Sequence, residues 1–297
     1  GVSGRHRFLT FGGAYHGDTI GSLSLGDGGF GTEVFDPLRF MVHRAPGYDD
    51  PRCIEVACEL IDVHSRELAA VVLEPLVQGA GGMLTHPPER FAALGEACRR
   101  ADVLLICDEV ATGFGRTGTL FASDQCGLRP DVLCLGKGIT GGYLPMSATV
   151  ASQRVYDAFL GEDLGPRTFS HGHSYSGNPL AAAVALRHLE LMFEWDVLAN
   201  VRARSAQLGA LLAARLGARP AVRDIRRQGL MVGIELAPPS PGMRWGRRVT
   251  AACVRRGVLT RPLGDVIVLM PPLTTTADEI DRIVDVLAAA LSEVCGG

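Results

Sequence analysis

The sequence lacks most of the features that would place it outside the ordinary globular proteins. No apolar run reaches the roughly 18 residues that a membrane-spanning helix needs. The first six residues, Gly1-Val2-Ser3-Gly4-Arg5-His6, lack the apolar core of a secretory signal peptide. They also lack an initiating Met, so we expect a fragment of a longer chain. The sequence contains no internal repeat and no low-complexity segment.

Charge and cysteine content exclude further classes. The formal net charge is only −3, so no basic excess predicts a nucleic-acid partner and no acidic block predicts a disordered tail. The eight cysteines form no C-x-x-C pair, and Cys107 and Cys134 lie inside apolar runs. We expect reduced thiols, a cytoplasmic location, and neither a membrane nor a nucleic acid as partner.

The 297 residues, 47% of them hydrophobic, suffice for one large domain and a smaller one. In the first part, apolar strand-like runs alternate with helix-like segments or long connections, which predicts an α/β fold with a mostly parallel sheet covered on both faces. The expected strands are 7–11, 69–73, 103–107, 132–135 and 147–151, and the expected helices are 54–65 and 88–101. Ligands on such sheets bind at the carboxyl ends of the strands.

The pattern changes after Pro179 and predicts a smaller α+β domain. Helices are expected at 179–194, 196–216 and 244–256, and strands at 230–236 and 266–270. Thr276, followed by Glu279 three residues later, predicts a capping box at the start of the last helix. We place the large domain at 1–190 and the C-terminal small domain at 191–297.

An acid and a lysine follow two of the predicted strands. Asp108 ends the run that begins at Val103, and Lys137 follows the next apolar run between two glycines. They are separated by 137 − 108 = 29 residues, enough for a strand, a connection and the next strand. A pyridoxal phosphate enzyme needs such a pair, because the lysine forms a Schiff base and the acid keeps the pyridine nitrogen protonated.

An ATPase is the rival interpretation of an acidic residue after a strand. That interpretation requires the phosphate-binding loop G-x-x-x-x-G-K-[ST]. Here Asp131 stands where the first glycine belongs, and Gly138 stands where Ser or Thr is required. The loop is absent. Each residue alone could still be structural: Asp108 as a strand-end acid and Lys137 as a solvated surface charge.

Longer motifs resemble those of the class III aminotransferases. They are Leu73–Met83, Cys107–Gly118 and Leu135–Gly138. Further motifs resemble the branch of that family that converts 8-amino-7-oxononanoate to 7,8-diaminononanoate in biotin biosynthesis. They are Ala14–Thr19, His171–Pro179 and Leu259–Ile267. The resemblance covers nearly the whole chain and implies the type I fold of pyridoxal phosphate (PLP) transferases.

The resemblance also implies roles for residues that bind the cofactor. Lys137 would form the Schiff base and move protons, and Asp108 would pair with the pyridine nitrogen. Tyr15 would stack on the cofactor ring, with Val110 on its opposite face. Ser174 would reach the cofactor phosphate of the neighbouring subunit, which implies a homodimer. Ordinary core packing of Tyr15 and a plain turn at Ser174 remain the alternatives.

Two arginines are implied at the substrate site. Arg261 would bind the substrate carboxylate, since the planar guanidinium binds carboxylates through two hydrogen bonds. Arg116 would line the same site, with an ion pair between domains as the alternative. Glu74 and Gln78 are expected near the site in supporting positions.

The resemblance leaves the amino donor open between S-adenosylmethionine and lysine, and it implies no metal. In the family, a phosphate anchor at a helix N-terminus precedes the segment that corresponds to Gly1, so we expect this chain to be inactive alone. Two alternatives stay open: another class III transaminase acting on ω-amines, and a truncated, catalytically silent chain.

Overall fold

The computed structural model describes residues 4–27, 31–240 and 242–296. The chain forms two compact units, neither of which is continuous in sequence. The first unit holds Gly1–Leu76, His86–Phe114 and Phe121–Glu194, and the second holds Val77–Thr85, Gly115–Leu120 and Trp195–Gly297. The predicted domain bounds, 1–190 and 191–297, treat each domain as one stretch. These bounds do not separate out the two short segments 77–85 and 115–120, and they stay a prediction.

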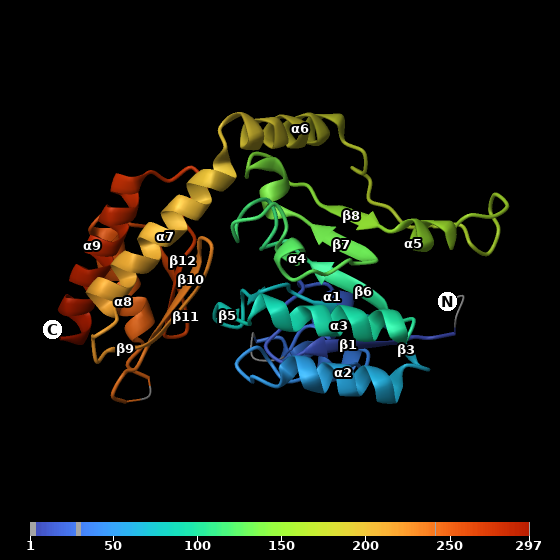
Figure 1. The fold of residues 1–297 in the computed structure, drawn as a ribbon, viewed down its shortest axis with the longest axis horizontal. Helices are drawn as coiled ribbons and strands as arrows, with labels where there is room; N and C mark the ends of the chain where they lie inside the picture. The colour runs from blue at the N-terminus through green and yellow to red at the C-terminus, as the bar shows by residue number, and fades with distance from the viewer. Residues whose placement is uncertain (1–3, 28–30, 241, 297) are drawn as a thin grey trace. The chain divides into compact units, whose positions relative to one another are not determined.

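A six-stranded sheet forms the first unit (Figure 1). Its strands lie in the order β2-β1-β3-β6-β7-β8, and all neighbours are parallel except β7 and β8. The strands are β1 Arg7–Phe11, β2 His43–Ala45, β3 Leu68–Leu73, β6 Leu104–Asp108, β7 Val132–Leu135 and β8 Ala148–Ala151. The central strand β3 is buried along nearly its whole length, as expected where a parallel sheet is covered by helices.

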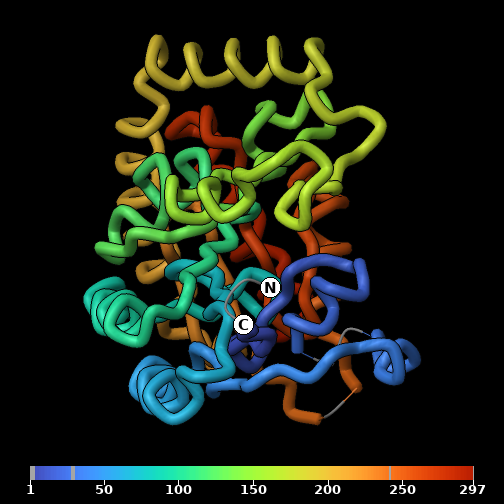
Figure 2. The backbone as a smooth tube through the Cα atoms, turned by 90° about the vertical axis from the view of Figure 1, so that its right-hand side faces the viewer, coloured from blue at the N-terminus to red at the C-terminus, as the bar shows by residue number. Residues whose placement is uncertain are grey.

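Helices and short turns connect these strands. They are α1 Ile20–Leu25, η1 Glu33–Leu38, α2 Cys53–His64, α3 Pro88–Arg100, α4 Ala122–Gln125, η2 Lys137–Thr140, α5 Gln153–Asp157 and α6 Pro179–Glu194. The helices α2 and α3 run side by side (Figure 1), and Figure 2 shows both nearly end on. Each buries an apolar stripe at helical spacing, for example Ile54, Ala57 and Ile61 of α2.

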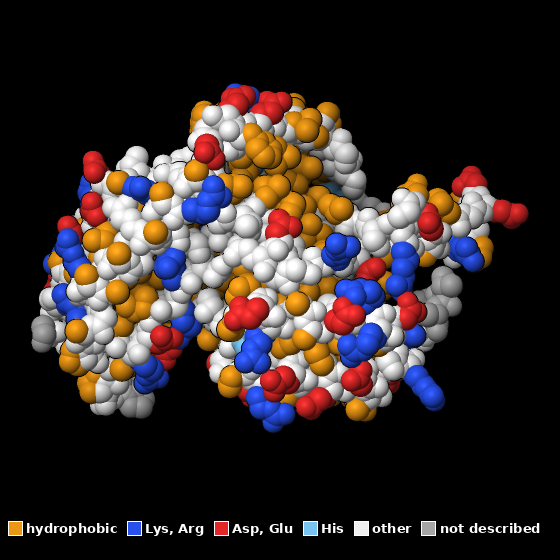
Figure 3. All heavy atoms as spheres, in the orientation of Figure 1, with side chains coloured by type: hydrophobic (Ala, Val, Ile, Leu, Met, Phe, Trp, Pro, Cys, Tyr) orange, Lys and Arg blue, Asp and Glu red, His pale blue; other side chains and the backbone are white. Residues whose placement is uncertain are grey.

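The helix α6 has an unusual distribution of side chains. Its buried positions include the small residues Ala181 and Ala185, whereas Leu180, Leu186 and Phe193 are exposed. Figure 3 shows hydrophobic side chains gathered on and below this helix. A surface of large apolar side chains is uncommon on a monomer and is typical of a contact surface.

The second unit contains an antiparallel sheet with the strand order β11-β12-β10-β9 and a short β4–β5 hairpin. The strands are β4 Val77–Gln78, β5 Leu84–Thr85, β9 Val222–Gln228, β10 Met231–Leu236, β11 Arg261–Leu263 and β12 Val266–Leu269. The helices are α7 Val197–Leu216, α8 Trp245–Arg255 and α9 Ala277–Cys295, and their buried faces share one apolar core. The predicted capping box of Thr276 and Glu279 is present at the start of α9.

The predicted helices and strands are confirmed, with ends that differ by one or two residues. Five strands were not predicted: β9, β11 and the short strands β2, β4 and β5. The short helices α1, α4 and α5 were not predicted either. In β9 four of the seven residues are charged and the strand lies at the sheet edge, so it lacks the apolar alternation that marks a strand. The short β11 contains a proline. Among the described residues, no helix has the length and apolar character to cross a membrane.

Candidate active site

The predicted acid and lysine lie at one edge of the first unit's sheet. The strands β3, β6 and β7 are parallel neighbours, so their carboxyl ends meet at that edge. Glu74 follows β3, Asp108 ends β6, and Lys137 follows β7 after one glycine. Asp108 is paired with Cys134, three residues before Lys137. The structure therefore confirms the predicted placement of these three residues.

Two hydrogen bonds fix the carboxylate of Asp108. Nδ1 of His16 lies 2.8 Å from Oδ2, and the backbone N–H of Val110 donates to Oδ1 at 3.0 Å. Because an ionised carboxylate only accepts, the imidazole donates from Nδ1. The side chains of His16 and Asp108 are only 4% and 13% exposed, so little water competes for this contact.

Sequence reasoning missed the role of His16. The residue lies in the motif Ala14–Thr19, but its partner Asp108 is 92 positions away in the sequence. Its second ring nitrogen, Nε2, is buried and has no hydrogen-bond partner among the described residues. Five other described side chains also have such an atom, so it is the direct contact with Asp108 that makes His16 a further candidate site residue.

Tyr15 and Glu74 hold the segment that carries His16. The backbone N–H of Tyr15 donates to Oε1 of Glu74 at 3.2 Å, and Tyr48 donates to the carbonyl oxygen of Glu74 at 2.7 Å. The hydroxyl of Tyr15 donates to Asp18 at 2.8 Å, and that hydrogen bond, together with burial, raises the pKa of Tyr15. Glu74 thus fixes the loop after β1, and its supporting position at the site stays a prediction.

Lys137 lies in a tightly constrained turn. Its φ angle is +40°, in the left-handed region that costs a non-glycine residue on the order of 1–3 kcal/mol. A Cβ atom on Gly136 would lie 3.2 Å from Cγ1 of Val110, and one on Gly138 would lie 3.1 Å from Cβ of Phe114. A side chain at either glycine would therefore need a small shift of Val110 or Phe114. The lysine side chain itself is exposed.

Two further side chains that were not predicted fix segments of the first unit near the site. Glu109 is fully buried and accepts hydrogen bonds from the N–H groups of Ala122 at 2.6 Å and Ser123 at 2.8 Å. It therefore holds the start of α4. A Cβ atom on Gly141, which has a φ of +60°, would lie 2.9 Å from Cδ2 of His188 on α6. The helix α6 thus packs directly on the turn that begins at Lys137.

Lys137 is also the only lysine in the sequence; the other 28 of the 29 basic residues are arginines. Any chemistry that requires a lysine amine of this chain must use it. This count was available from the sequence alone and strengthens the choice of Lys137 beyond its position after a strand.

The remaining predicted site residues lie in the turn before α6 and in the second unit. Ser174 is exposed in the turn before α6 of the first unit. Arg116, Arg261 and Gln78 belong to the second unit. The guanidinium of Arg116 donates to the carbonyl of Pro271, and burial lowers its pKa to about 10. Arg261 is exposed at the start of β11. The structure therefore brings together Tyr15, Asp108, Val110 and the Lys137 turn.

The profile of one protein family, "Aminotransferase class-III", matches residues 1–291. The chain belongs to the class-III aminotransferase family. A relative in Nitratidesulfovibrio vulgaris, an adenosylmethionine-8-amino-7-oxononanoate aminotransferase, is 47% identical over 99% of this chain and 58% of its own. The protein of the same name in Geobacter sulfurreducens is 43% identical over 99% of this chain and 69% of its own. This chain is thus shorter than both relatives.

Solved structures of family members share the fold. The adenosylmethionine-8-amino-7-oxononanoate aminotransferase of Methanocaldococcus jannaschii superposes with a TM-score of 0.93 at 38% identity, covering 98% of this chain and 69% of that one. An amine transaminase from an uncultivated Pseudomonas species, solved in a PLP-bound form, gives 0.90 at 36% identity, covering 98% and 70%. The predicted type I PLP transferase fold is confirmed.

Proposed function

We propose that this protein is a PLP-dependent transaminase that converts 8-amino-7-oxononanoate to 7,8-diaminononanoate in biotin biosynthesis. The observation that carries the proposal is that a largely buried, hydrogen-bonded Asp108 and the chain's only lysine lie at the ends of adjacent parallel strands. The substrate assignment is supported by the names of relatives that are 36–47% identical. The amino donor is S-adenosylmethionine or lysine.

The residues of the first unit fit the pyridine end of PLP. The carboxylate of Asp108 is fixed by two donors and keeps a small exposed fraction, so it can bind one more cationic donor. Gly136 and Gly138 keep the backbone close to Val110 and Phe114. When bound, PLP supplies an electron sink for the bond that breaks at the substrate's Cα. The Tyr15 ring and the Val110 side chain are proposed to enclose the two faces of its ring.

Each side chain then has a distinct task. Asp108 holds a proton on the pyridine nitrogen, and His16 holds Asp108 in the orientation that allows this. Lys137 would hold the cofactor through Nζ, and its amine would move the proton at the substrate's Cα. Because only Lys137 offers a lysine amine in this chain, no other residue of it can replace both functions.

Arg261 and Arg116 are proposed to bind the substrate. Arg261 is exposed at the start of β11, so its guanidinium can bind a carboxylate through two parallel hydrogen bonds. Arg116 remains protonated at neutral pH, since burial lowers its pKa only to about 10. Its hydrogen bond to Pro271 uses one of five donors and leaves the others for a ligand.

We further propose a homodimer in the cytoplasm. The large apolar side chains that α6 exposes, Leu180, Leu186 and Phe193, would be covered by the second copy. Ser174, in the exposed turn just before this helix, would then reach the cofactor phosphate bound by the partner.

The proposal is tested with the protein encoded by the complete reading frame, loaded with PLP. Incubation with 8-amino-7-oxononanoate and either S-adenosylmethionine or lysine should yield 7,8-diaminononanoate, measured by mass spectrometry. Turnover of ω-amines such as ornithine or 4-aminobutyrate, without diaminononanoate, would replace the substrate assignment. Absence of any spectral change of bound PLP with all donors would overturn the transaminase assignment and favour the catalytically silent alternative.

A further inference from the structure

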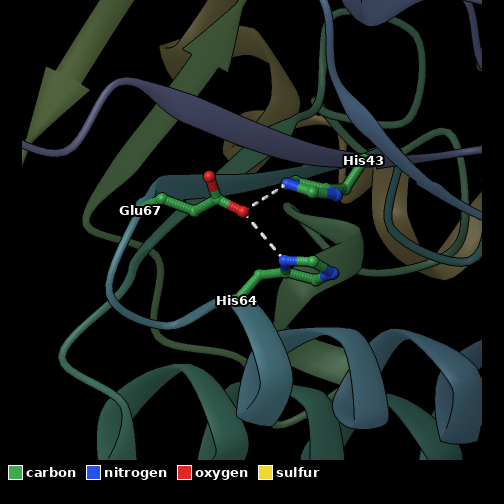
Figure 4. A group of neighbouring side chains, drawn as sticks. All are labelled: His43, His64 and Glu67. Carbon is green, nitrogen blue, oxygen red and sulfur yellow. Dashed lines mark hydrogen bonds and ion pairs between the residues drawn. The ribbon is translucent and has the colours of Figure 1, made fainter.

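Three side chains of the first unit converge where the parallel strands β2 and β3 begin, at the edge of the sheet opposite the carboxyl ends that carry the candidate active site. His43 begins β2, His64 ends α2, and Glu67 lies just before β3. Nε2 of His43 lies 3.0 Å and Nδ1 of His64 lies 2.8 Å from the same oxygen, Oε1 of Glu67. Figure 4 shows both rings directed toward that single oxygen.

We propose that His43, His64 and Glu67 form a binding site for Zn²⁺ or a chemically similar late first-row divalent cation. Two imidazole nitrogens and one carboxylate oxygen are a donor set that suits such ions. Mg²⁺ and Ca²⁺ are disfavoured, since they prefer oxygen ligands.

The distances fit this coordination after a small adjustment. Tetrahedral Zn²⁺ with bonds of about 2.0–2.2 Å has ligand atoms about 3.3–3.5 Å apart. The two nitrogen–oxygen distances are 2.8 and 3.0 Å, and the three ligand atoms all lie within 4.8 Å of one another. Opening these contacts by about half an ångström would admit the ion. The side chains are 25%, 29% and 42% exposed, so they can move and a water molecule can complete the coordination.

The backbone holds the three ligands in place before any ion binds. The N–H of Glu67 donates to the carbonyl of His64 at 3.0 Å, and the carbonyl of Glu67 accepts from the N–H groups of His6 and Arg7. His43 is paired with Leu9 in the parallel β1–β2 ladder. Each ligand thus comes from backbone that is already hydrogen-bonded, which lowers the conformational entropy lost on binding.

The alternative is a plain cluster in which two histidines bind one carboxylate. The imidazole rings are stacked, with centroids 3.9 Å apart and planes 28° from parallel. The hydrogen bond from His64, joined by that from His43, lowers the pKa of Glu67 against the opposing effect of burial. The carboxylate is therefore ionised and both facing nitrogens must carry protons. A divalent cation would bind the lone pairs of those two nitrogens, and each neutral ring would then carry its proton on the other nitrogen.

The test measures Co²⁺ and Zn²⁺ binding to the untagged, chelator-treated protein. We expect one equivalent of Co²⁺ to give visible d–d bands without the intense near-ultraviolet absorption of a cobalt thiolate, and Zn²⁺ to displace it. A thiolate band would show that Co²⁺ binds cysteine instead of the three proposed ligands, and the chain has eight free cysteines. Zn²⁺ should also raise the melting temperature, since it binds the folded state.

His64→Ala and Glu67→Gln should each weaken metal binding at least tenfold. Even the replacement of a residue that only hydrogen-bonds to a metal ligand typically lowers metal affinity 10–100-fold. His171→Ala is the matched control, since His171 is exposed and lies outside the cluster; it should bind as the parent does. His64 is the last residue of α2, so its replacement is the least disruptive, and circular dichroism verifies the fold of each variant. Equal binding by parent and His64→Ala, a thiolate spectrum, or no binding with Co²⁺ in excess would each overturn the proposal.

Discussion

The contact between His16 and Asp108 gives the sharpest prediction about catalysis. Replacement of His16 by alanine removes one of the two donors that fix the Asp108 carboxylate. A hydrogen bond to a charged group contributes about 1.5–3 kcal/mol. If that free energy is lost wholly from the transition state, the rate falls about 10- to 150-fold, since each 1.36 kcal/mol is a factor of ten. The exposed fractions of 4% and 13% place the effect in this range, because water can replace the lost donor only poorly.

His16→Asn is the matched control for this experiment. The amide nitrogen of asparagine can occupy the place of Nδ1 and donate to Oδ2, whereas alanine cannot. Turnover is measured per mole of cofactor-loaded protein, so that lost stability does not appear as lost rate. We expect alanine to lower kcat much more than it changes KM, and asparagine to restore most of the loss. Parent-like turnover of His16→Ala would refute the positioning role. Equal losses in both variants would show that the ring's volume matters, not its donor.

Four further predictions follow from the same structure. Lys137→Ala should abolish turnover, and borohydride reduction of the loaded parent should attach the cofactor to the peptide that contains Lys137; a label on any other peptide would contradict the assignment. Asp108→Asn should fold with a near-parent melting temperature yet lose orders of magnitude in rate, because a neutral amide cannot keep the pyridine nitrogen protonated; near-normal turnover would exclude that role. Leu186→Glu should shift sedimentation from dimer to monomer and Ser174→Ala should weaken cofactor retention more than kcat, whereas an active parent monomer would disprove the dimer. Thr276→Ala should destabilise the protein by about 1 kcal/mol at pH 7, measured as a lower melting temperature. Hydrogen bonds from the backbone N–H and the side chain of Thr276 lower the pKa of Glu279 below its ordinary 4.5, so this difference should persist above pH 4.5 and shrink as the pH falls through the lowered pKa.

The sequence predicted the central part of the site because it is encoded locally. Asp108 and Lys137 each follow an apolar run, and parallel strands place their ends at one edge of a sheet. The glycines beside Lys137 were visible too, although their close approach to Val110 and Phe114 was not.

Contacts between distant residues could not be predicted in this way. The hydrogen bond between His16 and Asp108 joins residues 92 positions apart. Nothing in the sequence around either residue indicates that the other is its partner. The strand β9 was missed because an edge strand with charged side chains has no buried face to produce alternation. Glu109 was visible beside Asp108, but its function as the buried acceptor for α4 depends on Ala122 and Ser123, which the pattern does not connect to it.

The discontinuity of the two units has a consequence for the order in which the chain can fold during synthesis. The chain passes between the units five times, after residues 76, 85, 114, 120 and 194. The carbonyl of Gly82 is bound by Arg226, which is translated 144 residues later, and the carbonyl of Arg116 is bound by the N–H of Leu230. At about 5–20 residues per second, the ribosome needs roughly 7–29 s to supply the partner of Gly82. During that interval the segments 77–85 and 115–120 are already made but lack the hydrogen bonds that Arg226 and Leu230 supply. They are therefore where a nascent chain would depend most on a chaperone, and a fragment that begins at residue 195 would lack both.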